Sequence, residues 1–120
     1  MPEQLKIEIV DGILRASVSG PFSLVNAKTF FQEILRVARE ENLDKILIDA
    51  RKITTKIPTT GRFEFGTHMS EQQPFRIKIA LVGSTDAVWP DRFLETVAHN
   101  RGVNARVTTE IKEALDWLVE

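Results

Sequence analysis

The residues that decide the fold lie at the start of the chain, in the stretch LKIEIVDGILRASV, residues 5–18. Apolar and charged side chains alternate up to Asp11-Gly12, which is the pattern of a half-buried strand. Asp11-Gly12 indicates a two-residue type I′ turn, because both central positions of that turn need a positive φ. Closing a hairpin there pairs apolar residues that we expect to face inward and polar residues that face outward: Val10–Ile13, Ile9–Leu14, Ile7–Ala16 and Leu5–Val18, then Glu8–Arg15 and Lys6–Ser17. One register satisfies both faces, so the stretch predicts an antiparallel hairpin.

Beyond the hairpin, helical and strand patterns alternate. Helical spacing of apolar residues predicts helices over about 24–41, 61–72, 90–100 and 110–118, the first capped by Ser23 and ended by Asn42, the last capped by Thr109. Mostly apolar stretches without alternation at 45–49 and 77–82 predict strands buried on both faces, and 103–107 alternates as a last short strand. The order β-β-α-β-α-β-α-β-α predicts an α/β fold. We expect one domain over residues 1–120, with a single mixed sheet that opens on the antiparallel hairpin, continues in parallel strands and is covered by helices.

Composition excludes several classes of function. The chain has 120 residues, 42% of them hydrophobic, a formal net charge of −1 and no cysteine. Thiol catalysis, disulfides and thiolate metal sites are therefore excluded, and the charge offers no electrostatic case for a nucleic acid or an anionic membrane. The longest uninterrupted apolar run is Ile79–Val82, far short of the ~20 residues that a membrane span needs. No signal peptide is visible, and we expect a cytoplasmic protein that is not an integral membrane protein.

Several segments together resemble a known family. These are the opening hairpin, KILID at 45–49, IKIALV at 77–82, NRGV at 100–103 and EALDWL at 113–118. They resemble the STAS domain, the sulphate-transporter and anti-sigma-factor-antagonist family, in its SpoIIAA-like branch. The resemblance covers about Leu5 to Val119. It implies the mixed-sheet fold above and a non-enzymatic regulatory or protein-interaction module, whose protein partner the sequence does not identify.

The resemblance also implies a switch. In signalling members, the loop after the third strand carries Asp-Ser-Ser-Gly, and a partner kinase phosphorylates the serine beside the glycine. The matching stretch here is Pro58-Thr59-Thr60-Gly61, with Thr60 at the phosphorylated position. Pro58 replaces the acidic residue, and threonines replace both serines. Thr59, Thr60 and Gly61 are thus a hypothetical switch loop; the alternative is that Thr59 or Thr60 is only a helix N-cap.

A second candidate site follows from sheet geometry. Ligands of open α/β sheets bind beyond the carboxyl ends of the parallel strands. Polar residues that we expect at that edge, for a ligand or a partner, are Asp49, Arg51, Ser84, Thr85 and Asp86, with Thr108 and Thr109 beside them. The alternative is that they are turn and cap residues.

Other features point to no chemistry. His68 and His99 have no partner at a metal-ligand spacing, no nucleophile motif occurs, and the two glycines of residues 61–66 fall within a predicted helix. We therefore predict no catalytic residue, no metal and no cofactor. Phe63, Phe65 and Met69 are more apolar side chains than one short helix can bury. They keep open a second function, a small-molecule or lipid carrier with an apolar pocket. An enzyme ranks third, and a homodimer stays open.

Overall fold

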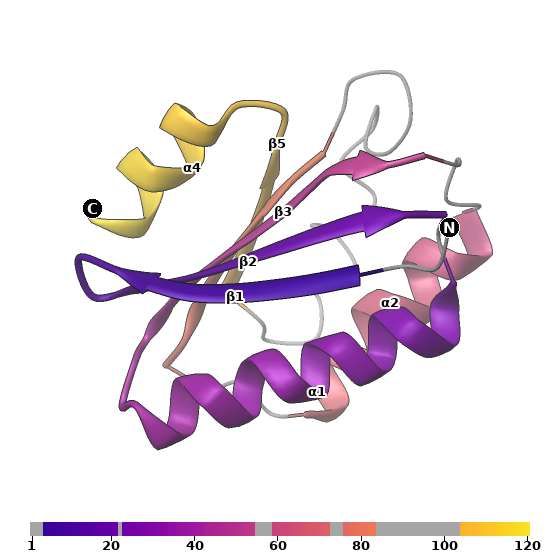
Figure 1. Ribbon diagram of the computed structural model, residues 1–120, viewed down its shortest axis with the longest axis horizontal. Helices are drawn as coiled ribbons and strands as arrows, with labels where there is room; N and C mark the ends of the chain where they lie inside the picture. The colour runs from indigo at the N-terminus through magenta and orange to yellow at the C-terminus, as the bar shows by residue number, and fades with distance from the viewer. Residues whose placement is uncertain (1–3, 22, 55–58, 73–75, 84–103) are drawn as a thin grey trace.

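The computed structural model describes residues 4–21, 23–54, 59–72, 76–83 and 104–120. Within them, a five-stranded mixed sheet in the order β1-β2-β3-β4-β5 is flanked by helices (Figure 1). The elements are β1 Gln4–Val10, β2 Ile13–Gly20, α1 Leu24–Glu40, β3 Lys45–Ile53, α2 Thr59–Glu71, β4 Lys78–Val82, β5 Asn104–Thr108 and α4 Ile111–Leu118. The helix predicted over 90–100 lies outside the described residues. No described helix is long and apolar enough to cross a bilayer.

The opening hairpin has the predicted turn and register. Asp11 and Gly12 adopt φ values of 52° and 78°, and all six predicted pairs are formed. One part of the prediction is wrong: the Val10–Ile13 pair does not face the same side as Ile9–Leu14. Side chains alternate along a strand, so Ile13 points to the opposite face, where it packs with Leu47 and Leu118.

The predicted sheet topology is confirmed. β1 and β2 are antiparallel, and β2–β3, β3–β4 and β4–β5 are parallel. β3 is longer than the predicted 45–49, because its ladder with β2 continues to the pair Gly20–Ile53. The Thr54 N–H then donates to the Gly20 carbonyl at 2.9 Å, which extends the pairing one residue further.

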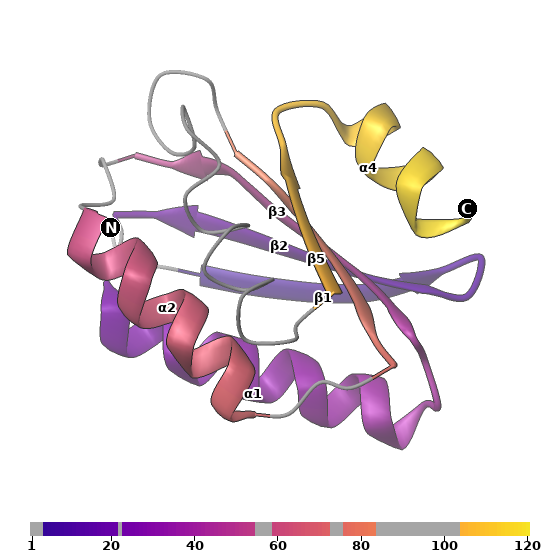
Figure 2. The same ribbon diagram turned by 180° about the vertical axis from the view of Figure 1, so that it is seen from behind.

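Helices cover the two faces of the sheet unequally. α1 and α2 lie together on one face, over a large core that includes Phe31, Leu35 and Met69 (Figure 2). Ser23 caps α1 as predicted, its Oγ accepting from the Asn26 N–H, and Asn42 follows the helix with a φ of 55°. On the other face α4 packs on β3, β4 and β5, over a smaller core.

The end of the chain departs from prediction in two details. α4 has Glu110 at its N-cap, with no side-chain cap, so Thr109 does not cap the helix; the Glu110 N–H instead donates to Thr108 Oγ1 at 3.3 Å. Leu115 is only partly buried, whereas Leu118 is fully buried. The face of α4 that meets the sheet is therefore narrower than the apolar stripe in its sequence.

Candidate functional site

The carboxyl ends of β2 and β3 and the first turns of α1 and α2 meet at one end of the molecule (Figure 1). The two helices run side by side in the same direction, opposite to the parallel strands. Since helix N-termini carry partial positive charge and free N–H groups, this edge suits acceptor and anionic groups. It is the edge at which the sequence predicted a site.

Thr60 lies at this edge with an exposed side chain, in the first turn of α2. α2 is described from Thr59 rather than from Gly61, and residues 55–58 just before it lie outside the described residues. The alternative that Thr59 or Thr60 is only a helix N-cap therefore stays a prediction. Gly61 is buried, and the first turn holds no acidic residue. The Thr60 hydroxyl is thus accessible at the positive end of the helix.

Asp49 and Arg51 form a tight pair near the end of β3. They are two residues apart on a strand, so their side chains share a face. Arg51 Nε donates to Asp49 Oδ1 at 3.0 Å, Nη2 donates to Oδ2 at 2.9 Å, and the Arg51 backbone N–H donates to Oδ1 at 3.1 Å. Partial burial alone would raise the pKa of Asp49, but these bonds and the charges of Arg51 and Lys52 hold that pKa below its usual value. The carboxylate stays ionised and is largely satisfied within its own strand.

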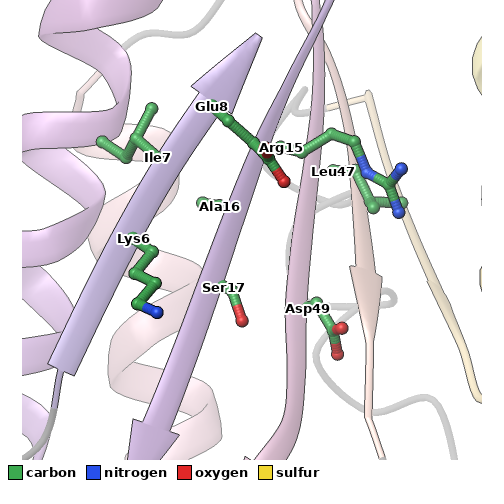
Figure 3. Close-up of a pocket in the computed structure, with 8 residues that line it drawn as sticks. All are labelled: Lys6, Ile7, Glu8, Arg15, Ala16, Ser17, Leu47 and Asp49. Carbon is green, nitrogen blue, oxygen red and sulfur yellow. The ribbon is translucent and has the colours of Figure 1, made fainter. Parts of the chain in front are cut away.

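Asp49 also lies in an open hollow of about 630 Å³ over β1, β2 and β3, on the same sheet face as α4 but beside the area that α4 covers (Figure 3). Sheet register builds this hollow from two rows of side chains. One row is Lys6, Ser17 and Asp49, and the other is Glu8, Arg15 and Leu47. Figure 3 shows Arg15 extending over β3 beside Leu47, its partner in the β2–β3 ladder. Ile7 and Ala16 complete the lining. The hollow combines two positive and two negative side chains with the Ser17 hydroxyl, so it suits a polar surface rather than a lipid tail.

The other residues of the predicted edge divide into two groups. Ser84, Thr85 and Asp86 lie outside the described residues. Thr108 is buried, with its hydroxyl accepting from the Glu110 N–H, and Thr109 is exposed. Thr108 therefore acts as a turn residue between β5 and α4. The structure places Asp49 with Arg51 at the sheet edge and brings Lys6, Arg15 and Ser17 to Asp49, which the sequence did not predict.

His68 is buried in the layer beneath the sheet, not in the hollow. Its ring lies 6.0 Å from Phe31 and 6.5 Å from Phe65, centroid to centroid, and Phe65 meets Phe31 edge-on at 5.7 Å. Met69 is fully buried, whereas Phe63 is 45% exposed. As the sequence predicted, α2 does not bury Phe63, Phe65 and Met69 together. Among the described residues, no group of three or more histidine and carboxylate side chains could hold a metal ion; His99 lies outside them.

The element order, the mixed sheet and the helix pair beneath it define the fold of the STAS-type anti-sigma factor antagonists. A solved relative shows this directly. The crystal structure of an anti-sigma factor antagonist from Mycobacterium paratuberculosis matches with a TM-score of 0.70, over 99% of this chain and 96% of that chain, at 18% sequence identity. A likeness at that identity shows the fold. No family model matches the sequence, and no curated protein matches it.

Proposed function

We propose that this protein is a non-enzymatic regulatory module of the cytoplasm, which binds another protein at the carboxyl edge of its sheet and is switched by phosphorylation of Thr60. The observation that carries the proposal is the exposed Thr60 side chain in the first turn of α2. The fold shared with an anti-sigma factor antagonist supports it. The Asp49–Arg51 pair and the polar hollow on β1–β3 lie on the same strands and supply further polar contacts.

The physics of the switch depends on where Thr60 lies. A phosphate adds about −1.5 to −2 charges and strong acceptor oxygens. At the first turn of a helix it meets free backbone N–H groups and the positive end of the dipole, so the folded state tolerates it. The same charge repels an acidic partner surface or pairs with an arginine cluster. Phosphorylation therefore changes partner binding without unfolding the module.

The test compares partner binding of the wild type with that of Thr60→Glu. Partners are captured from a lysate of the source cells, and their affinities are then measured by calorimetry. We expect Thr60→Glu to change the Kd of the captured partner by about tenfold or more, because a charged hydrogen bond contributes about 1.5–3 kcal/mol. Mass spectrometry of protein purified from the source cells should show phosphate on Thr60.

Thr29→Glu is the matched control. Thr29 is an exposed threonine in the second turn of α1 whose hydroxyl donates to the Val25 carbonyl at 3.0 Å, so the substitution adds the same charge on the neighbouring helix rather than at the start of α2. We expect this variant to bind the partner with wild-type affinity. Equal affinities for the wild type and Thr60→Glu, together with no phosphate on Thr59 or Thr60, would refute the switch.

A further inference from the structure

The outer edge of β1 is an open strand edge. β1 is the first strand of the sheet, and β2 is its only sheet neighbour among the described residues (Figure 1). The strand runs for seven residues without a proline, a glycine or a bulge. Its apolar side chains Ile9 and Val10 are 46% and 37% exposed. Proteins usually protect such an edge with charged side chains, proline, bulges or a covering element, because it pairs readily with another strand, and β1 has of these the charges of Lys6 and Glu8.

The turn fixes which backbone groups of β1 point outward. A two-residue hairpin closes on a hydrogen-bonded pair, here Val10–Ile13, and the paired positions then alternate along the ladder. Lys6 and Glu8 therefore direct their N–H and C=O groups toward β2. Leu5, Ile7 and Ile9 direct theirs to the open edge. Any strand that adds to the sheet at this edge bonds to those three residues.

We infer that this edge pairs with the same edge of a second copy of the chain, antiparallel and with the two-fold axis at Ile7. In that register Ile7 faces Ile7 of the other copy, and Leu5 faces its Ile9. All three are residues with outward-pointing backbone groups, so every such pair forms the reciprocal bonds of an antiparallel ladder. The two sheets become one continuous sheet, and the exposed Ile9 side chain is covered by Leu5 of the second copy.

The charges on β1 select this register. With the axis at Ile7, Lys6 lies opposite Glu8 of the second copy, and Glu8 lies opposite its Lys6. These are non-hydrogen-bonded positions, where the side chains of an antiparallel pair come closest. An axis at Lys6 or at Glu8 would instead place two like charges face to face. An axis at Leu5 or Ile9 would leave fewer residues paired. The sequence of β1 is thus complementary to itself in one register.

The pairing also places the two hollows relative to each other. Lys6 and Glu8 line the hollow, which lies beside α4 on the same face of the sheet. A two-fold axis perpendicular to the sheet keeps this face on the same side in both copies, so the two hollows lie on one surface, on either side of the axis. This inference does not depend on the proposed switch at Thr60. It concerns the outer edge of β1 and a second copy of the chain, whereas the switch concerns the carboxyl ends of the strands and a different protein.

Charge reversal tests the pairing and its register. Oligomeric state is measured by sedimentation equilibrium, with circular dichroism to verify the fold of each variant. The wild type is expected to be a dimer. Lys6→Glu places a glutamate opposite Glu8 of the second copy, and Glu8→Lys places a lysine opposite its Lys6. Each change introduces two like-charge pairs by symmetry, so we expect the dimer dissociation constant to rise by about tenfold or more.

Two rescue experiments separate pairing from damage to the hairpin. The double variant Lys6→Glu/Glu8→Lys restores opposite charges across the axis, and it should dimerise like the wild type. An equimolar mixture of the two single variants should form a heterodimer, because one chain then carries only negative and the other only positive charge at these positions. Within one chain Lys6 faces Ser17 and Glu8 faces Arg15, so neither rescue restores an internal pair.

Lys112→Glu provides the control for charge. Lys112 lies on α4, where its Nζ atom pairs with Asp116 Oδ2 at 3.0 Å. The substitution Lys112→Glu changes the net charge by the same amount as Lys6→Glu. This variant should remain a dimer. A monomeric wild type at millimolar concentration would overturn the inference. So would single variants that dimerise as tightly as the wild type, or a mixture that fails to form the heterodimer.

Discussion

Gly12 occupies a backbone conformation that only a few residues tolerate. Its φ is 78°, and a Cβ built there meets nothing within 4 Å, so backbone strain alone penalises a side chain. We expect Gly12→Ala to lower the free energy of unfolding by about 1–2 kcal/mol, the cost of a left-handed alanine. Urea unfolding followed by circular dichroism measures this.

Gly12→Asn tests the cause of that loss. Asparagine adopts the left-handed region at little cost, and the space around Gly12 accommodates its side chain. The asparagine variant should therefore recover most of the stability that alanine loses. If both variants are as stable as the wild type, the turn does not require the positive φ at this position.

His68 is a histidine kept neutral by its surroundings. Its side chain is 7% exposed, and its Nε2 atom has no hydrogen-bond partner among the described residues. Burial lowers the pKa of His68, and the Lys28 charge lowers it further. A hydrogen bond with the Lys28 backbone and the charge of Glu71 oppose the shift without cancelling it. Protonation therefore favours the unfolded state.

This makes stability depend on pH in a defined direction. Because the folded-state pKa lies below the unfolded value of about 6.5, the stabilisation is complete above pH 6.5 and is lost as the pH falls through the folded pKa. We expect the free energy of unfolding to fall in this range by up to about 1.4 kcal/mol per pH unit. Urea unfolding at a series of pH values measures the slope.

His68→Phe keeps a planar ring between Phe31 and Phe65 but removes the titrating group. Its unfolding free energy should vary less with pH over the range from about 5 to 7. An unchanged slope in this variant would show that another group causes the acid sensitivity.

At the scale of the elements, α4 is held to the sheet by a few buried apolar contacts and by two basic side chains that lie beside Trp117. Ala114 and Leu118 are fully buried against Leu47, Ala80 and Val82. Lys78 Nζ donates to the Trp117 carbonyl at 3.1 Å and lies 5.1 Å from the Trp117 ring centroid. Arg106 lies 5.9 Å from the same ring. A cation near the last carbonyls of a helix also opposes its dipole.

Leu118→Ala should therefore be the most costly single truncation in α4. Removing a fully buried leucine costs about 2–5 kcal/mol, through lost transfer energy and the cavity left behind. Leu115→Ala should cost less, since Leu115 is partly exposed, and Val119→Ala, at a position 65% exposed, should change stability by no more than about 0.5 kcal/mol. Chemical denaturation ranks the three variants. A larger loss for Leu115→Ala than for Leu118→Ala would contradict the packing described.

Local chemistry explains which elements were predictable. The β1–β2 register follows from Asp11-Gly12 and from residues at most fifteen positions apart, so the sequence determines it directly. The end of β3 depends on the pairing of its Ile53 with Gly20 of β2, and the start of α4 depends on the turn between Thr108 and Glu110. The ends of these elements are set by residues distant in sequence or by backbone geometry. The preferences of single residues for helix or strand therefore do not predict them.

At the scale of the whole molecule, the same distinction applies to the candidate site. The sequence predicted the parallel-strand edge and placed Asp49, Arg51 and Thr60 near it. It did not predict the hollow, because Lys6, Ser17 and Asp49 line up only once the β2–β3 register is known. The sequence did predict the outward-facing polar pairs of the hairpin. It did not predict which residues of β3 lie beside them.

The sheet order repeats the order of the strands in the chain, from β1 to β5. Among the strands that the structure describes, none has to enter between two that are already paired, and the hairpin that starts the series needs only local contacts. During synthesis each strand that leaves the ribosome therefore meets the open side of its completed predecessor. Each later strand pairs with the strand that precedes it in the chain, so no addition closes a connection longer than a single crossover, and assembly can proceed from the N-terminus without rearrangement.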